Sequence, residues 1–106
     1  MKLVIIIYSN DPETVWNAFR LRIFSRKQGD VVSVFLLGKG VEVESLDSDK
    51  FDIAEQIHSF LDIGGAILAC GTCLKLRQSE ELGICPISTM QDLYTLIHDS
   101  DKVLSF

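Results

Sequence analysis

The sequence lacks any apolar run long enough to cross a membrane. Its main apolar runs, at residues 3–8 and 66–69, fall far short of the ~20 residues that a spanning helix needs. The N-terminus carries Lys2 but no longer apolar segment and no small-residue cleavage site, so we expect no secretory signal and a cytoplasmic location. We therefore expect no membrane partner.

Positive charge is also scarce in this chain. Ten Lys and Arg residues stand against fifteen Asp and Glu residues, for a formal net charge of −5. A surface with that balance repels phosphate backbones and anionic lipid headgroups. The composition therefore disfavours direct binding to nucleic acid.

Internal repeats, linkers and low-complexity tracts are absent as well. The chain has 106 residues, of which 47% are hydrophobic and 24% are charged, which is ordinary for a globular protein and excludes disordered and collagen-like classes. This length suits one domain that buries most of its unfolded surface. We predict a single domain over residues 1–106.

Strand-like and helix-like segments alternate along the chain. Strands are predicted at residues 2–9, 31–37, 66–70, 84–87 and 102–106, and the first two are near-continuous apolar runs typical of strands covered on both faces. Helices are predicted from Pro12 to Gly29 and from Phe51 to Gly64, with a short helix or turn at residues 73–77 and a last helix after residue 88. The alternation predicts an α/β fold of three layers, α/β/α, around a mostly parallel five-stranded sheet.

Local signals place the ends of several elements. Asp11 is a predicted N-cap before Pro12, and residues 88–91 fit a capping box for a helix whose inner face holds Leu93, Leu96 and Ile97. The acidic stretch at residues 41–50 predicts a surface connection or a short irregular helix. Residues 38–40 lack the third glycine of a dinucleotide fingerprint and predict a tight turn.

Three polar connections follow the first three predicted strands, at residues 9–11, 38–40 and 70–73. Ligands and reactive groups collect beyond the carboxyl ends of parallel strands, because the loops diverge there. We therefore expect these three connections to share one edge and to hold the site.

The third connection carries a C-x-x-C motif, Cys70 and Cys73, which in a cytosolic α/β chain indicates redox or sulfur chemistry. Both thiols lie at a predicted helix N-terminus, where the local field can lower a cysteine pKa to roughly 3.5–7.5. Lys75 and Arg77 add positive charge, and the Gly71 N–H is placed to hold an anionic persulfide. Cys70 and Cys73 are the predicted catalytic residues, with an accessible thiolate that accepts sulfur from a donor.

Other interpretations of the cysteines remain open. Cys85, beside Pro86 in an apolar run, is predicted to be inert, and inert packing is also an alternative for the C-x-x-C pair. A zinc site needs a fourth ligand, from His58 or His98; we predict neither a metal nor an organic cofactor. A thioredoxin-like dithiol reductase and a non-catalytic oligomeric binding module are the competing functions, although the motif follows the third strand rather than the first.

Four segments together resemble the DsrE/DsrF-like family of small sulfur-relay proteins. They are Ala69-Cys70-Gly71-Thr72-Cys73-Leu74-Lys75, Pro12-Glu13-Thr14-Val15-Trp16-Asn17-Ala18, Val34-Phe35-Leu36-Leu37-Gly38-Lys39-Gly40-Val41-Glu42, and Ser88-Thr89-Met90-Gln91-Asp92-Leu93 before Asp101-Lys102-Val103-Leu104. The resemblance spans nearly the whole chain and is strongest to the C-x-x-C subgroup. That subgroup usually continues with Ala-Arg-Gly, where this chain has Leu76-Arg77-Gln78.

The resemblance implies a function and an assembly. It implies a three-layer α/β/α domain, a homo-oligomer such as a trimer or hexamer, and donor and acceptor proteins for sulfur. It places the sulfur-carrying cysteine on Cys70 and a second relay or resolving thiol on Cys73, which releases the sulfur as an intramolecular disulfide forms. A sulfurtransferase-type carrier that accepts sulfane sulfur as a persulfide on Cys70 and passes it on is the expected function.

Overall fold

A single parallel sheet organises the computed structural model, which describes residues 1–46, 50–53, 55–57, 66–77 and 87–106. The five strands lie in the order β4-β3-β2-β1-β5, and each neighbouring pair is parallel. The strands are β1 (Lys2–Ile7), β2 (Val31–Leu36), β3 (Ala66–Cys70), β4 (Ile87–Ser88) and β5 (Lys102–Ser105). The predicted α/β class is confirmed, and the described sheet is parallel throughout.

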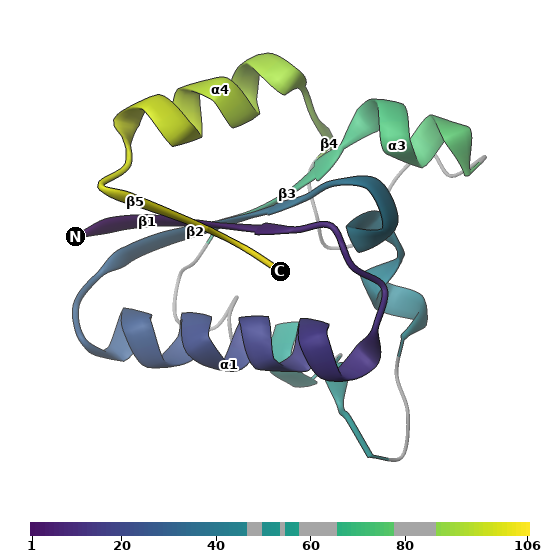
Figure 1. Ribbon diagram of the computed structural model, residues 1–106, viewed down its shortest axis with the longest axis horizontal. Helices are drawn as coiled ribbons and strands as arrows, with labels where there is room; N and C mark the ends of the chain where they lie inside the picture. Colours follow the sequence, from purple (N-terminus) through teal and green to yellow (C-terminus); the bar gives the residue numbers. More distant parts are fainter. Residues whose placement is uncertain (47–49, 54, 58–65, 78–86) are drawn as a thin grey trace.

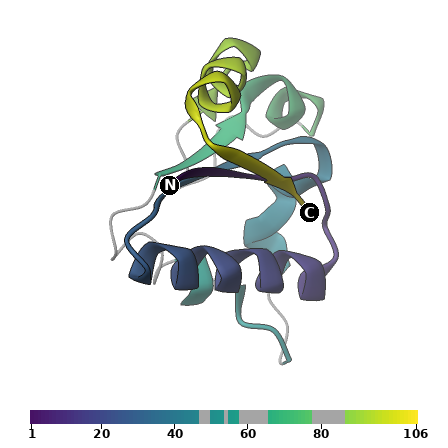
Figure 2. The same cartoon turned by 60° about the vertical axis from the view of Figure 1, so that its left-hand side comes forward.

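Helices cover both faces of this sheet. The helix α1 (Pro12–Lys27) lies on one face, and the helices α3 (Gly71–Leu76) and α4 (Met90–Asp99) lie on the other, as Figures 1 and 2 show. The three layers predicted from the alternation of segments are therefore present. Within the described part of the chain, no helix is both long and apolar enough to span a membrane.

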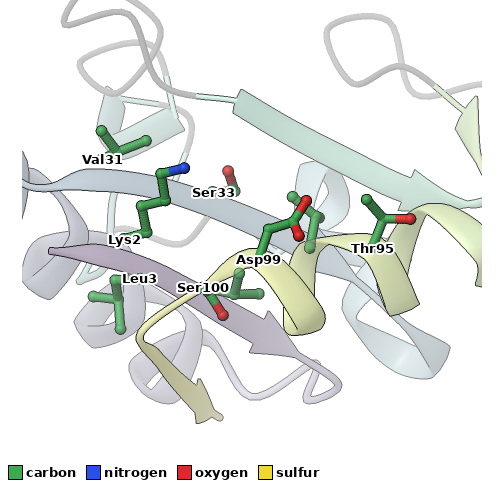
Figure 3. Close-up of a pocket in the computed structure, with 9 residues that line it drawn as sticks. Lys2, Leu3, Val31, Ser33, Thr95, Asp99 and Ser100 are labelled. Carbon is green, nitrogen blue, oxygen red and sulfur yellow. The ribbon is translucent and has the colours of Figure 1, made fainter.

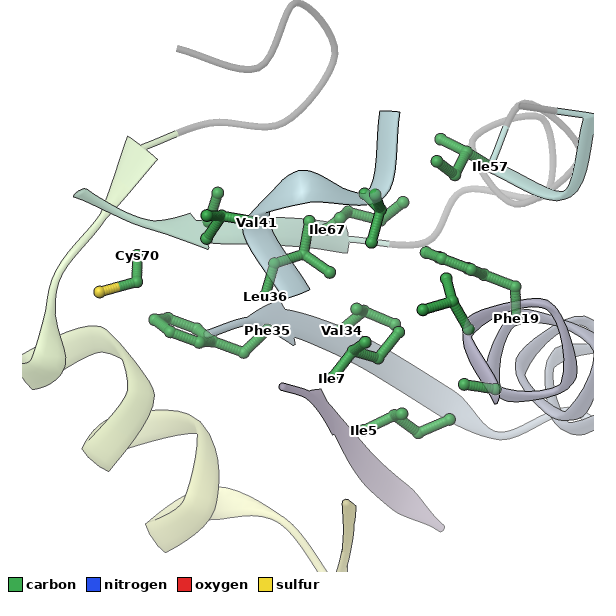
Figure 4. Close-up of a cluster of buried hydrophobic side chains, with 14 of the residues drawn as sticks. Ile5, Ile7, Phe19, Val34, Phe35, Leu36, Val41, Ile57, Ile67 and Cys70 are labelled. Carbon is green, nitrogen blue, oxygen red and sulfur yellow. The ribbon is translucent and has the colours of Figure 1, made fainter. Parts of the chain in front are cut away.

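The centre of the sheet forms the core. In β1, four residues are at most 3% exposed, as expected for a strand with a helical layer on each side: Leu3, Val4, Ile5 and Ile7. Figure 4 shows side chains of β1, β2 and β3 packed together, with Phe19 of α1 at one end of the cluster. This rigid centre fixes the positions at which β1, β2 and β3 end.

The first helix begins where the sequence predicts. Asp11 is the N-cap and its carboxylate accepts the Thr14 N–H at 2.9 Å, with Pro12 in the first turn. The inward face of α1 also includes Arg22, which is fully buried and donates from Nη2 to the Val32 carbonyl oxygen at 2.7 Å. The apolar spacing of the sequence gave no indication that this arginine would be buried.

The last helix begins one residue later than the predicted capping box. Thr89 is the N-cap, its Oγ1 accepts the Asp92 N–H, and the Asp92 carboxylate accepts the Thr89 N–H in return. Ser88 instead ends β4 and donates its hydroxyl to Asp92 at 2.6 Å. Leu93 faces the core as predicted, but Ile97 is 41% exposed, so its assignment to the inner face is wrong.

The connection after β2 is a 3₁₀ helix, η1 (Gly38–Ser45). Of the two forms expected for residues 41–50, the short irregular helix is confirmed over residues 41–45, and a surface connection is wrong there because Val41 and Val43 are at most 2% exposed. The two valines alternate with acidic residues in the sequence and belong to the hydrophobic core. The acidic composition of this stretch gave no indication that they would be buried.

Further along, Ile53 and residues 55–57 are helical, and Ile53 and Ile57 are buried, as predicted for the helix that begins near Phe51. Its other predicted inner positions, Ala54, Phe60 and Leu61, and its predicted end at Gly64-Gly65 lie outside the described residues. So do residues 84–86 of the predicted fourth strand.

Candidate functional site

Three strand ends meet in register at one edge of the sheet. Ile7 pairs with Leu36, and Leu36 pairs with Ala69. The connections that follow these residues therefore leave the sheet side by side, and Figure 1 shows the chain after β1, the 3₁₀ helix η1 and the helix α3 at this same end. The predicted meeting of the three polar connections is confirmed.

Two glycines allow η1 to pass close to β1. Gly38 has a φ of 55°, in the left-handed region that favours glycine. A Cβ on Gly40 would lie 1.9 Å from the Ile7 carbonyl oxygen, so no side chain fits there. The Gly40 N–H donates to the Leu37 carbonyl oxygen at 2.9 Å, which is the tight turn predicted for residues 38–40.

Cys70 is the last residue of β3 and belongs to the hydrophobic core. Its side chain is 3% exposed, and Figure 4 shows it at the end of the buried cluster, on the side of Phe35. β4 lies beside it, with Ser88 paired to Cys70 in the sheet. The expectation of an accessible Cys70 sulfur is therefore wrong for the single chain.

Cys73 lies in the first turn of α3 and is partly exposed. Its Sγ accepts a hydrogen bond from the Gly38 N–H at 3.2 Å. Removal from water is the largest cause that raises the pKa of the Cys73 thiol, followed by its contact with the Cys70 thiol, whereas the Gly38 N–H and the Arg77 charge act in the opposite direction. The lowered pKa that the sequence predicts for this thiol is wrong in direction.

Arg77 connects α3 to η1. Its Nε donates to the Glu42 Oε2 at 2.7 Å, and its Nη1 donates to the Cys73 carbonyl oxygen at 3.1 Å. The hydrogen bond from Arg77 is the largest cause that lowers the pKa of Glu42. The sequence singled out Arg77 only as a positive charge and missed Glu42, which lies 35 positions earlier.

A hollow of about 480 Å³ opens at the same edge. It is lined by Tyr8, Ser9, Asn10, Gly38 and Lys39. Gly38 belongs to both features, since it lines the hollow and its N–H contacts the Cys73 sulfur. Gly38 is therefore the residue that links the hollow to Cys73.

A second hollow, of about 190 Å³, lies at the opposite edge, where β1 and β2 begin and α4 ends. Figure 3 shows Lys2, Ser33, Thr95 and Asp99 around it. Neither described cysteine lines this hollow, and its polar groups are separated from Cys73 by the length of the strands.

The remaining candidates from the sequence do not join Cys73. His98 is exposed near the end of α4 and lies 3.1 Å from the Asp99 carboxylate, at the far edge of the sheet. Cys85 and His58 lie outside the described residues. Among the residues that the structure describes, no three His, Cys, Asp or Glu side chains converge as metal ligands.

Comparisons with known proteins agree with this architecture. The model of the DsrE/DsrF-like family matches residues 1–106. An uncharacterized protein of Methanocaldococcus jannaschii, MJ0989, is 27% identical over 114 residues and covers all of both chains. An uncharacterized protein of Methanopyrus kandleri, MK0008, is 27% identical over 113 residues and covers 98% of this chain and 93% of its own.

Solved structures share the fold. The ychN protein from E. coli superposes with a TM-score of 0.85 at 23% identity, and the match covers all of both chains. A conserved protein of unknown function from Bacteroides thetaiotaomicron, BT1422, has a TM-score of 0.82 at 21% identity and covers 99% of this chain and 94% of its own. At these identities the likeness establishes the fold.

Proposed function

This chain belongs to the DsrE/DsrF-like family, whose members are sulfur-relay proteins, and from that premise we propose that it carries sulfane sulfur as a persulfide on the pair Cys70 and Cys73. The observation that carries this proposal is the placement of two contacting thiols at the carboxyl edge, one buried and one partly exposed. The partly exposed thiol of Cys73 also accepts a hydrogen bond from the Gly38 N–H, which belongs to a separate segment. These three features support a relay in which sulfur enters at an accessible thiol, is held on a protected thiol and is stabilised by a hydrogen-bond donor.

Cys73 is the entry thiol in this proposal, because it is partly exposed and accepts a hydrogen bond from Gly38, which lines a hollow at this edge. Its thiolate attacks the outer sulfur of a donor persulfide, R–S–SH. The bond between the two donor sulfurs breaks, its electron pair leaves on R–S⁻, and Cys73 becomes a persulfide. The Gly38 N–H donates a hydrogen bond to the Cys73 sulfur. Such a bond is stronger when the sulfur is anionic, because charge-assisted hydrogen bonds are the strong ones.

Cys70 is the holding thiol, because its burial keeps water and oxidants away from the sulfur. The Cys70 sulfur attacks the terminal sulfur of the Cys73 persulfide, and the bond between that sulfur and the Cys73 Sγ breaks. The Cys73 sulfur leaves with the electron pair and takes up the proton that Cys70 gives up. No net oxidation occurs, and the reverse transfer delivers the sulfur to an acceptor thiol.

The test is to incubate the reduced chain with glutathione persulfide and weigh the intact protein. The wild-type chain should gain about 32 Da, and the added sulfur should survive a brief treatment with dilute glutathione. Cys70→Ser should gain the same mass on Cys73 and lose it in that treatment, because the sulfur stays on the exposed thiol. Cys73→Ser should load far more slowly, because the donor then has to reach a buried thiol.

Cys85→Ser is the matched control and should behave as the wild-type chain does. A double variant without Cys70 and Cys73 that still gained the sulfur, or a wild-type chain that gained none, would contradict the proposed relay.

The contact between the two thiols also favours a second candidate, a dithiol reductase. Such an enzyme forms a Cys70–Cys73 disulfide and loses about 2 Da where the relay gains sulfur. The C-x-x-C motif follows β3 rather than the first strand, which is not the chain order of thioredoxin-like enzymes. A dithiol potential outside roughly −270 to −120 mV would remove this candidate.

A further inference from the structure

Two links join the helix α3 to the 3₁₀ helix η1 at the site. One is the hydrogen bond from the Gly38 N–H to the Cys73 Sγ, and the other is the ion pair between Arg77 and Glu42. Gly38 and Glu42 belong to η1, while Cys73 lies in α3 and Arg77 caps its end. The two links therefore hold the same pair of segments together.

We propose that Arg77 is a positioning residue, whose ion pair with Glu42 and hydrogen bond to the Cys73 carbonyl keep the Gly38 N–H against the Cys73 sulfur. The inference rests on the proposed function, since it concerns the thiol through which sulfur enters. It assigns the pair Arg77 and Glu42 the task of holding the persulfide-binding amide in place.

The relative strengths of the contacts support this role. Sulfur is a weak acceptor, so a single N–H···S bond holds two segments poorly. The Arg77 guanidinium donates one hydrogen bond to a carboxylate on η1 and another to a carbonyl on α3. Charge-assisted hydrogen bonds are roughly twice as strong as neutral ones. The side chains of Arg77 and Glu42 are 28% and 35% exposed, so water screens this pair less than a fully exposed one.

The carbonyl that Arg77 binds is that of Cys73 itself. In a helix of only six residues, the last carbonyls have no partner within the helix and need one from elsewhere. The Arg77 side chain supplies that partner and fixes the turn of α3 from which the Cys73 side chain projects. One residue thus orients both the sulfur and, through Glu42, the segment that carries the amide donor.

Positioning and simple charge predict opposite results for one variant. Among the described residues, the groups that act on the pKa of Cys73 or Glu42 include Cys70, Gly38, Arg77, Lys39 and Asn10. If Arg77 acted only by its charge, Glu42→Gln would unmask that charge and lower the pKa of Cys73. If Arg77 acts by position, the same variant releases η1, weakens the Gly38 hydrogen bond and raises the pKa of Cys73.

The experiment uses the full chain without a sulfur donor and makes two measurements. The first is the pH dependence of iodoacetamide alkylation at Cys73, located by tandem mass spectrometry. The second is the rate of hydrogen exchange of the Gly38 amide. Glu42→Gln should shift the alkylation midpoint up by about 0.5 pH unit and speed Gly38 exchange about tenfold. Arg77→Gln should move both in the same direction and by more. Arg77→Lys keeps the positive charge without the pair of hydrogen bonds to Glu42 and the Cys73 carbonyl. It should shift the alkylation midpoint and the Gly38 exchange rate by less than Arg77→Gln does.

Lys75→Gln is the matched control, because it removes a cation from α3 that makes no bond to η1 in the described structure; it should leave Gly38 exchange unchanged. A Glu42→Gln variant with a lower midpoint, or with unchanged Gly38 exchange, would overturn the positioning role. Neither readout requires sulfur transfer, so a failure here is distinct from a failure of the relay itself.

Discussion

The two edges of the sheet both carry polar side chains and a hollow, but they are connected differently. At the carboxyl edge, side chains join segments that are distant in sequence, as Gly38 joins Cys73 and Arg77 joins Glu42. At the amino edge, polar side chains of α4 mostly bond to their own helix, as Thr95 does to Gln91 and Ser100 to Ile97. The long-range contacts of the amino edge, from the Met1 amino group to Asp30 and from the Lys2 N–H to Asp101, lie among exposed groups, whereas those of the carboxyl edge are partly buried.

This difference indicates at which edge the positions of polar groups depend on the whole fold. A partly buried bond between two distant segments forms only in the folded chain, and water screens it less than an exposed one. A hydroxyl that bonds to its own helix turn is set by that turn alone. We therefore expect substitutions at the carboxyl edge to cost more than matched ones at the amino edge.

The largest effect is expected for Gly40→Ala. The added Cβ would meet the Ile7 carbonyl oxygen at 1.9 Å, so backbone rather than a flexible side chain has to shift, and we expect a loss of about 3 kcal/mol in the free energy of unfolding. Urea denaturation measures it. Gly38→Ala in the same turn meets nothing within 4 Å and should lose only about 1 kcal/mol, from its left-handed backbone; equal losses would contradict the steric argument.

The next effect separates the two thiols. Cys70→Ser places a hydroxyl among core side chains and should cost about 2 kcal/mol. Cys73→Ser should stay within about 0.5 kcal/mol, because the site is partly exposed and the serine oxygen accepts the Gly38 N–H as well. Native iodoacetamide labelling should reach Cys73 before Cys70, and the reverse order would show that the burial of Cys70 does not hold in solution.

A comparison within α4 tests the two edges on one helix. Thr89→Ala removes the N-cap at the carboxyl edge and should cost about 1 kcal/mol. Ser100→Ala removes a hydroxyl bond at the other end and should cost less than about 0.5 kcal/mol. Both bonds are local, so thermal unfolding of the two variants under one condition compares the N-cap with the hydroxyl bond at the other end, and equal costs would contradict the larger contribution of the cap.

The cap also predicts a pH dependence. The Ser88 hydroxyl, followed by the Thr89 N–H, lowers the pKa of Asp92 below its ordinary 3.8. A carboxyl with a lowered folded pKa stabilises the fold above its unfolded pKa, and that contribution is lost as the pH falls through the folded value. The stability difference between the wild-type chain and Asp92→Asn should therefore be constant near pH 7 and shrink below pH 3.8; acid titration of both proteins measures it.

The smallest effect is expected at the amino edge. Asp99→Asn changes an exposed carboxylate that pairs with the exposed His98, so stability should change by less than about 0.5 kcal/mol. The alkylation midpoint of Cys73 should not move. A measurable shift at Cys73 would show that the two edges are coupled through the sheet.

Much of the fold was predictable from particular residues. Asp11 and Pro12 mark the start of α1, and the apolar run of β1 predicts a strand covered on both faces; both are confirmed. The predictions were wrong where tertiary contacts override the local sequence pattern. Arg22 is buried because a distant carbonyl accepts its N–H, and Ile97 is exposed because the helix packs on Leu93 and Leu96 instead.

The candidate site divides in the same way. Its location followed from the rule that polar connections of parallel strands share an edge, and the C-x-x-C spacing identified the two thiols. Their environments did not follow. A helix N-terminus predicts a lowered pKa for Cys73, yet burial raises it, and Cys70, which was expected to be accessible, belongs to the hydrophobic core.

The sequence by itself determined the alternation of strands and helices, the edge at which the cysteines lie and the family to which the chain belongs, because periodicity, caps and motifs are local properties. Only the tertiary structure decided which thiol is exposed, which amide reaches its sulfur and which arginine holds the two segments together. Those properties depend on distances between residues some 35 positions apart, and such distances are set by the packing of the whole sheet rather than by any stretch of chain.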